Sequence, residues 1–133
     1  MYLVDANVWL ERLLDQAKSE EVGQFLGYLP SDRLAITDFA LHSIGVVLSR
    51  LKQKEVLLRF VRDVFVDGGV NLIRLEPEDT QHLVDVMEQF DLDFDDAYQY
   101  MAAEKYGLTL VSLDSDFDRT ERGRKTPAEA LTD

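Results

Sequence analysis

Acidic side chains follow three short apolar runs of this sequence, and they are the groups best suited to chemistry. They are Asp5 after residues 2–4, Asp38 after the run at 34–36, and the pair Asp114 and Asp116 after residues 108–113. A dense acidic stretch, residues 91–118, holds eight acids, including Asp96, and one base. Carboxylate oxygens without His or Cys partners are the ligands that Mg²⁺ and Mn²⁺ prefer. The pattern therefore predicts a site for a hard divalent cation.

The apolar runs that precede these acids alternate with helical patterns. Residues 2–4, 34–36, 70–75 and 108–113 are predicted strands. Apolar residues at helical spacing predict helices at about 8–14, 17–29, 52–65, 77–90 and 95–106, with a last turn opened by Pro127. A further helix has its apolar stripe at 40–51 and is predicted to be capped by Thr37 or Asp38. Strands separated by helices form βαβ units, which predict an α/β fold with a parallel sheet covered on both faces. A length of 133 residues fits a single domain, residues 1–133.

Ligands of such sheets bind at the carboxyl ends of the strands. If the first and fourth strands are neighbours, Asp5, Asp96, Asp114 and Asp116 meet at one edge of the sheet. Carboxylates in such a group raise one another's pKa values unless a cation compensates their charge. The chemistry that this site would support is metal-assisted hydrolysis, in which bound ions polarise a phosphoryl oxygen and activate a water molecule.

Some of the acids also have ordinary structural interpretations. Asp93 and Asp95 are expected to favour the start of a helix through its dipole, and Glu104 is expected on a solvated face. Asn7 is predicted to cap the helix that begins at Val8, because Asn side chains accept hydrogen bonds from free backbone N–H groups. With Asn7 as the cap, Asp5 is left for a functional role.

The composition narrows the classes of partner. There are 14 Lys and Arg against 26 Asp and Glu, which gives a net charge of −12 and excludes tight binding of nucleic acid by bulk electrostatics. The absence of cysteine excludes disulfides and Cys-ligated metal sites and is consistent with a reducing, cytoplasmic location. No apolar run is long enough to cross a bilayer, and the first residues do not form a signal peptide.

Three segments resemble the PIN domain, a nuclease family that includes the VapC-type toxins. They are Val4-Asp5-Ala6-Asn7-Val8, Asp95-Asp96-Ala97 and the run from Leu110 to Phe117. Their order and spacing and the length of the chain all agree with the family, so the resemblance covers nearly the whole chain. It implies a three-layer αβα sandwich with a short parallel sheet of four to five strands, and cleavage of RNA that depends on Mg²⁺ or Mn²⁺.

The resemblance also implies a role for each matching residue. Asp5, Asp96 and Asp114 are similar to the metal-binding acids of the family, and Asp116 is similar to an auxiliary catalytic acid. Two further positions match supporting residues: Asn7, which would orient the first acid, and Ser112, a small hydroxyl residue before the third.

One position departs from the family pattern. A Glu usually lies in the helix after the second strand, and Ser43 occupies that position here. A serine can support a metal-bound water but supplies no charge. Asp38, five residues earlier, is the nearest acid that could substitute, while His42 is interpreted as an ordinary surface or core histidine. The loss of the Glu raises the question of whether a second metal binds.

Basic residues that could contact RNA lie in two groups. The first is Arg119, Arg122, Arg124 and Lys125, and the second is Arg50, Lys52 and Lys54. Ordinary surface charge explains both groups equally well. Trp9 is interpreted as a core residue.

The sequence therefore predicts a metal-dependent endoribonuclease similar to the toxin of a type II toxin–antitoxin module. The resemblance implies an RNA substrate, an antitoxin partner and a homodimer, with no membrane association. The alternative is a PIN fold that lost activity with its Glu and now binds RNA or protein. A response-regulator receiver is less consistent, because no acid that could accept a phosphoryl group and no lysine follow the appropriate strands.

Overall fold

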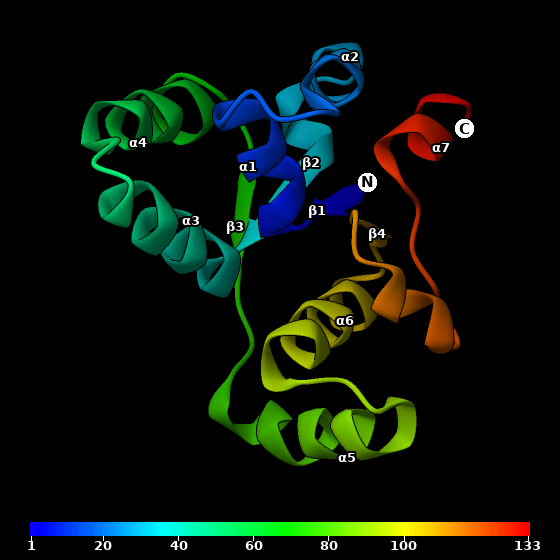
Figure 1. Ribbon diagram of the computed structural model, residues 1–133. Helices are drawn as coiled ribbons and strands as arrows, with labels where there is room; N and C mark the ends of the chain where they lie inside the picture. Colours follow the sequence, from blue (N-terminus) through cyan, green and yellow to red (C-terminus); the bar gives the residue numbers. More distant parts are fainter.

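Four short parallel strands form one sheet at the centre of the protein (Figure 1). The structure, a computed structural model, describes residues 1–133. The strands are β1 (Tyr2–Val4), β2 (Leu34–Thr37), β3 (Asn71–Ile73) and β4 (Thr109–Val111), in the order β3-β2-β1-β4. In the register of the sheet, Leu3 lies opposite Ala35 on one side and Leu110 on the other. The first and fourth strands are therefore neighbours, which is the condition on which the predicted acidic site depends.

Seven helices and four short helical turns connect the strands. The helices are α1 (Ala6–Leu13), α2 (Ser19–Tyr28), α3 (Asp38–Arg50), α4 (Lys54–Val61), α5 (Thr80–Phe90), α6 (Phe94–Tyr106) and α7 (Pro127–Leu131). The turns are the 3₁₀ helices η1 (Ser31–Arg33), η3 (Pro77–Asp79) and η4 (Ser115–Arg119) and the π-helical turn η2 (Arg62–Val66). No helix is long and apolar enough to span a lipid bilayer.

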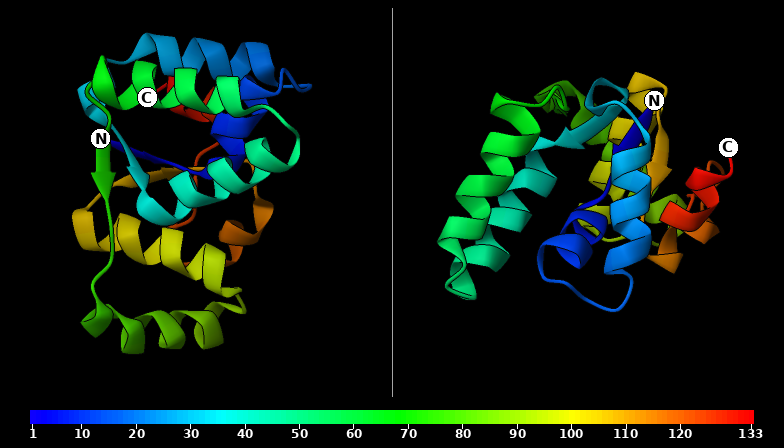
Figure 2. Two further views of the ribbon diagram at one scale, coloured as in Figure 1. Left: turned by 90° about the vertical axis from the view of Figure 1, so that its left-hand side faces the viewer. Right: turned by 90° about the horizontal axis from the view of Figure 1, so that it is seen from above.

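Two hydrophobic cores lie on opposite faces of the sheet, because successive side chains of a strand point to opposite faces. Val4, Ile36 and Val111 point to the face covered by α1 to α4 and α7. Leu3 and Leu110 point to the face covered by α5 and α6. The helices lie on either side of the sheet in both views of Figure 2. This confirms the α/β sandwich with four strands.

Most predicted helix boundaries agree with the structure to within a few residues, and one predicted helix is divided for a clear reason. The segment predicted as one helix over 52–65 is divided into α4 and η2, whose π-helical geometry carries the chain into Gly68. A Cβ at Gly68 would lie 2.6 Å from the Asp63 carbonyl oxygen, so only glycine fits after this turn. At the end of α6, Gly107 adopts the left-handed conformation that the sequence pattern predicts for a helix stop.

The prediction that Asn7 caps the first helix is wrong. α1 begins at Ala6, and the side chain of Asp5 accepts the hydrogen bond from the Ala6 backbone N–H. The strand ends directly at Asp5, so the helix starts two residues earlier than expected. Asp5 therefore has a capping role as well as its place at the sheet edge. For α3, Thr37 is the cap, one of the two residues predicted for that role.

Candidate metal centre

Asp5 lies at the carboxyl end of β1 and is almost completely buried, with 8% of its surface exposed. Its Oδ1 accepts hydrogen bonds from the Ala6 backbone N–H at 2.8 Å and from Gln99 Nε2 at 3.1 Å. Its Oδ2 accepts a hydrogen bond from Ser112 Oγ at 2.8 Å. Burial raises the pKa of Asp5, the three hydrogen bonds oppose this shift, and the charge of Asp114 adds to it. The carboxylate is thus held in one orientation.

Ser112, directly after β4, connects the first strand to the acidic turn that follows the fourth. Its hydroxyl donates to Asp5 and accepts from Asn7 Nδ2 at 3.2 Å and from the Asp114 backbone N–H at 3.0 Å. Asn7 Oδ1 in turn accepts from the Leu113 backbone N–H at 3.1 Å. Ser112 therefore contacts Asp5 directly, and Asn7 contacts Ser112 rather than Asp5. Their hydrogen bonds hold the ends of β1 and β4 together.

Gln99 is a buried site residue that the sequence analysis did not identify. It lies on α6, one helical turn after Asp96, and its Nε2 donates to Asp5 while its Oε1 accepts from Thr37 Oγ1. Thr37 Oγ1 accepts from the Ala40 backbone N–H and so caps α3. The signal in the sequence was a lone amide three residues after Asp96, on a helix face otherwise made of Ala, Tyr and Met. Gln99 thereby links α6 to the residues that cap α1 and α3.

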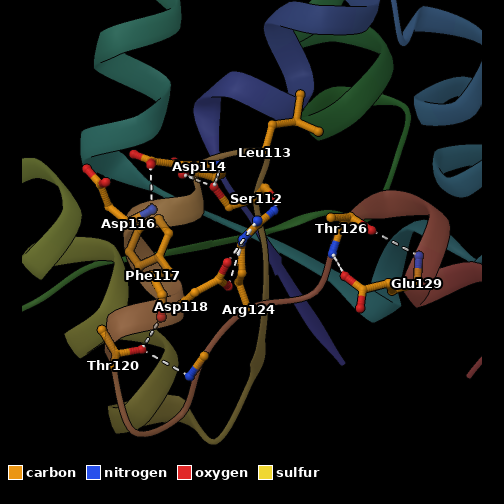
Figure 3. Close-up of polar contacts among 12 residues, drawn as sticks. Ser112, Leu113, Asp114, Asp116, Phe117, Asp118, Thr120, Arg124, Thr126 and Glu129 are labelled. Atoms are coloured by element: carbon orange, nitrogen blue, oxygen red, sulfur yellow. Dashed lines mark hydrogen bonds and ion pairs between the residues drawn. The ribbon is translucent and has the colours of Figure 1, made fainter.

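Three carboxylates form a tight cluster beside Asp5. Oxygen atoms of Asp96, Asp114 and Asp116 all lie within 4.8 Å of one another, and each side chain is partly exposed. Asp114 Oδ1 accepts from the Asp116 backbone N–H at 2.8 Å, which closes the turn that opens η4 (Figure 3). Asp5 lies behind this cluster, with both of its oxygens in hydrogen bonds.

Asp96 is the most perturbed acid of the cluster. Partial burial and then the charges of Asp93, Asp114, Asp5 and Asp116 raise its pKa to about 7. Asp93 is the N-cap of α6 and accepts from the Asp96 backbone N–H at 2.9 Å, which agrees with the structural role expected for it. The concentration of negative charge is therefore greatest around Asp96, where a cation would relieve it.

A hollow of about 260 Å³ adjoins these acids. Ser43 lines it, together with Asp5, Asp96 and Phe39. The residue that replaces the usual Glu of α3 therefore does face the site. Asp38 does not line this hollow. Its Oδ1 accepts from the Tyr98 hydroxyl and the Phe39 backbone N–H, both at 2.8 Å.

The four basic residues considered for RNA binding all make contacts within the protein. Arg124 pairs with Asp118 through two nitrogens at 3.1 and 3.2 Å and donates to the Ser112 carbonyl at 3.0 Å (Figure 3). Arg122 donates to the Leu108 carbonyl, and Lys125 pairs with Asp133. Arg119 donates to the Phe90 and Asp91 carbonyls and lies 3.4 Å from Asp116. These contacts give each of them a structural role.

Comparisons with known proteins agree with this architecture. A sequence model of the PIN domain matches residues 2–123. No curated protein sequence matches the chain significantly.

Solved structures with the same fold are similar over nearly their whole lengths. A toxin–antitoxin complex from Klebsiella pneumoniae is 22% identical, with 97% of this chain and 99% of that chain covered and a TM-score of 0.77. FitAcB from Neisseria gonorrhoeae is 20% identical, with 96% and 98% covered and a TM-score of 0.75. VapC20 from Mycobacterium tuberculosis, a toxin that cleaves the sarcin–ricin loop, is 15% identical, with 89% and 93% covered and a TM-score of 0.76. The chain, matched by the family model over residues 2–123, belongs to the PIN-domain family.

Proposed function

We propose that this protein is a metal-dependent endoribonuclease and the toxin component of a toxin–antitoxin pair. The observation that carries the proposal is the cluster of Asp96, Asp114 and Asp116, whose oxygens lie within 4.8 Å of one another at the end of the sheet beside the buried Asp5. The Mycobacterium tuberculosis relative in fold is described as a toxin that cleaves the sarcin–ricin loop. Membership of the PIN-domain family supports the same chemistry.

The donor set fits a hard divalent cation. All of the clustered ligands are carboxylates, which suit Mg²⁺ or Mn²⁺ better than Zn²⁺. The pKa of Asp96 is raised first by partial burial and then by the charges of neighbouring acids, and a cation would relieve the second cause. Asp96, Asp114 and Asp116 would hold the ion, with Asp5 adjacent. When bound, Mg²⁺ or Mn²⁺ supplies polarisation of the phosphoryl oxygen and activation of water for the hydrolysis of a phosphodiester.

The residues around the cluster hold it in position. Ser112 and Gln99 donate hydrogen bonds to the two oxygens of Asp5, so the carboxylate at the end of β1 is held in one orientation. Asp114 caps η4 and thereby orients Asp116. A site built on strand ends and helix starts keeps its geometry better than one built on free loops. The chain's own contribution is therefore a fixed, dense negative charge.

Ser43 gives the alternative function its support. It lines the same hollow as Asp5 and Asp96 but contributes no charge, so this part of the site has fewer anionic ligands than the family pattern. A site weakened in this way fits a PIN module that binds RNA or protein without cutting it. Metal affinity distinguishes the two functions, because an inactive module would bind Mn²⁺ weakly.

The experiment that tests the proposal is cleavage of a labelled RNA pool by the purified protein with Mg²⁺ or Mn²⁺. We expect cleavage that EDTA and the Asp96→Asn substitution both abolish. Asp67→Asn is the matched control, because Asp67 is exposed and precedes β3, at the opposite end of the sheet. Cleavage that persists in Asp96→Asn would refute the assignment of the site. No cleavage with any metal by folded protein would favour the binding module.

A second groove, also lined in part by α1, supports the proposed antitoxin partner. It has a volume of about 650 Å³ and lies among α1, α2, α4 and η2. Trp9 lines it and is 4% exposed, and its Nε1 has no hydrogen-bond partner. Because this Nε1 is itself buried, a bound segment would contact the apolar lining of the groove rather than this donor. Arg12, Arg59 and Asp63 also line the groove, and the excess of positive charge would favour acidic residues in that segment.

The partner proposal predicts inhibition as well as binding. A small protein that occupies the groove should suppress RNA cleavage, and Val56→Glu in the lining should restore cleavage in its presence. Ser49→Glu, an exposed position on α3 that does not line the groove, is the control. A partner that inhibits the Val56→Glu and native proteins equally would show that it binds elsewhere.

A further inference from the structure

Three aromatic rings pack together between α3 and α6, next to the acidic cluster. The ring centroids of Phe39 and Tyr98 lie 5.2 Å apart, those of Phe39 and Phe94 6.0 Å apart, and those of Phe94 and Tyr98 6.2 Å apart. Phe94 is the first residue of α6 and is 45% exposed, whereas Phe39 and Tyr98 are partly buried. The packing thus leaves one phenyl ring open to solvent, two residues before Asp96.

The other two rings hold Phe94 in a fixed environment. The Tyr98 hydroxyl donates to Asp38 Oδ1 at 2.8 Å and accepts from the Leu75 backbone N–H at 3.0 Å. Tyr98 is therefore tied at once to α3 and to the segment after β3. Phe39 lies in the first turn of α3, where the cap residue Thr37 fixes the helix start. A ring supported in this way is ready to stack without a loss of conformational entropy on binding.

The aromatic cluster separates two hollows of the surface. Phe39 lines the hollow that contains Asp5 and Asp96. Phe94 and Tyr98 line a neighbouring hollow of about 220 Å³, together with Glu76 and Asp79. A group that lies across the rings therefore has the acidic centre on one side and a small, partly apolar recess on the other.

The charges around the rings determine what can bind there. The basic side chains that follow η4 are engaged with carbonyls and carboxylates, and acids line both hollows. In the second hollow, Glu76 pairs with Arg74 and Asp79 pairs with Lys105, whereas the acids of the first hollow have no basic partner. A phosphate without a metal is therefore repelled from the first hollow. A nucleobase carries no charge and has a flat face, and such faces stack on aromatic side chains in proteins that bind single strands.

We infer that Phe94, supported by Phe39 and Tyr98, stacks the unpaired base of a nucleotide that adjoins the bond to be cut. This inference rests on the proposed nuclease function and adds a binding element to it: the substrate must present an unstacked base at the site of cleavage. Phe94 is a positioning residue, since its ring holds the nucleotide while the acids act on the phosphate.

Phe94→Ala, Phe94→Leu and Phe94→Trp form the test series. Their substrate is a short single-stranded RNA that the native protein cuts at one bond. Removal of an aromatic ring that stacks a base should lower kcat/KM by about 5- to 150-fold. We expect this loss for Phe94→Ala, a similar loss for Phe94→Leu, which keeps apolar volume without a ring, and retained activity for Phe94→Trp. Val84→Ala, another exposed apolar position, is the control.

Two further substrates separate stacking from a general structural effect. One RNA lacks the base of the nucleotide on one side of the cleaved bond, and the other RNA lacks the base on the other side. For one of these two RNAs, the native protein should lose as much activity as Phe94→Ala loses on the complete RNA, and Phe94→Ala should lose nothing further. Thermal unfolding of each variant should match that of the native protein.

The outcomes distinguish this inference from the proposed function. If the native protein cuts no RNA with any metal, the nuclease proposal fails and the stacking role fails with it. If the native protein cuts RNA but Phe94→Ala retains kcat/KM within about twofold, only the stacking role is overturned. Equal losses by Phe94→Ala on complete and abasic RNAs would also overturn it and would assign the rings to packing or to a protein partner.

Discussion

The Ser112 hydroxyl donates a 2.8 Å hydrogen bond to Asp5 Oδ2 and so joins two residues that are 107 positions apart in the chain. The same oxygen accepts from Asn7 and from the Asp114 backbone N–H. Because every hydrogen-bonding position of this hydroxyl is used, Ser112 controls the relative positions of the buried acid and the exposed cluster.

Replacing Ser112 with Ala should weaken metal binding. The change removes a hydrogen bond that stabilises the Asp5 carboxylate and frees the turn that carries Asp114, and losses of this kind typically reduce metal affinity by about 10- to 100-fold. Calorimetric titration with Mn²⁺ measures the effect. Ser115→Ala is the control, because Ser115 is exposed in the same turn. Equal Mn²⁺ affinities for Ser112→Ala and the native protein would contradict the role given to Ser112.

Replacing Gln99 with Leu should destabilise the fold. Leu fits the volume of Gln approximately, but it leaves the Thr37 hydroxyl without its acceptor and Asp5 without a donor in a buried place. An unsatisfied buried polar group costs about 1–3 kcal/mol, so the free energy of unfolding in urea should fall by that amount. Gln89→Leu, on the exposed face of α5, should change it little. A stability of Gln99→Leu equal to that of the control would show that the link is not needed.

The stability of the metal-free protein should fall as the pH rises from about 4 to 7. The pKa of Asp96 is about 7 in the folded protein and near 3.8 in the unfolded chain, so between these values the folded state holds the extra proton. A state that binds more protons loses stability as protons are withdrawn. Urea unfolding at a series of pH values measures the change.

The Asp96→Asn variant and added Mn²⁺ are the two controls of this pH dependence. Asn does not titrate, so the decline should be smaller in the variant. Mn²⁺ should restore stability to the native protein above pH 7 and should have little effect on Asp96→Asn. Asp79 and Asp133, whose pKa values are lowered by Lys105 and Lys125, act at lower pH and in the opposite direction. Parallel curves for both proteins would exclude Asp96 as the source.

Replacing Ser43 with Glu should increase metal affinity. The side chain lines the hollow next to Asp5 and Asp96, so a carboxylate there adds an anionic ligand, and added ligand charge strengthens binding of hard cations, here by roughly tenfold. Mn²⁺ titration of Ser43→Glu and of Ser49→Glu, an exposed position on the same helix, compares the two sites. Without metal, the Ser43→Glu protein should be less stable than the Ser49→Glu protein at pH 8. An unchanged Mn²⁺ affinity would mean that Ser43 lies too far from the ion.

Binding of RNA should depend only weakly on salt. Each phosphate that a protein neutralises adds about 0.7 to the slope of log affinity against log salt for a single strand. Arg122, Arg124 and Lys125 are engaged within the protein, and the net charge is −12. We therefore expect the slope of log affinity against log salt to be below about 2. Binding of a fluorescent RNA to the Asp96→Asn protein, which should not cleave it, measures this slope. A slope of 5 or more would show that these side chains leave their partners to bind phosphates.

The arrangement of the sheet could be predicted from the sequence because its signals are local. Each apolar run is followed by an acid and then by a helical pattern, and the rule for parallel sheets places those acids together. The neighbouring positions of β1 and β4 confirm that the strand order allows this. The roles of Asp5, Asp96, Asp114 and Asp116 in metal binding stay predictions until an ion is bound.

The hydrogen-bond network could not be predicted, because it joins residues that are distant in the chain. Gln99 contacts Asp5 and Thr37, which are 94 and 62 positions away, and its one local signal, a lone amide on the helix face, does not indicate these partners. The cap of α1 was assigned to Asn7, although Asp5 takes it, because propensity ranks Asn and Asp about equally and only the strand end decides between them. The basic cluster suggested RNA contacts because its carbonyl and carboxylate partners are not visible in sequence.

The segment that carries those basic residues covers the β4 edge of the sheet. The Lys125 backbone N–H donates to the Leu110 carbonyl, and the Lys125 carbonyl accepts from the Ser112 N–H, so Lys125 forms a parallel bridge with Val111 at the outer side of β4. An uncovered outer strand offers its free N–H and C=O groups to other chains and promotes aggregation. Arg124 holds this segment in place through a hydrogen bond to the Ser112 carbonyl and an ion pair with Asp118. The segment after the acidic turn thus covers the β4 edge and hinders the strand that precedes Asp114 from pairing with another molecule.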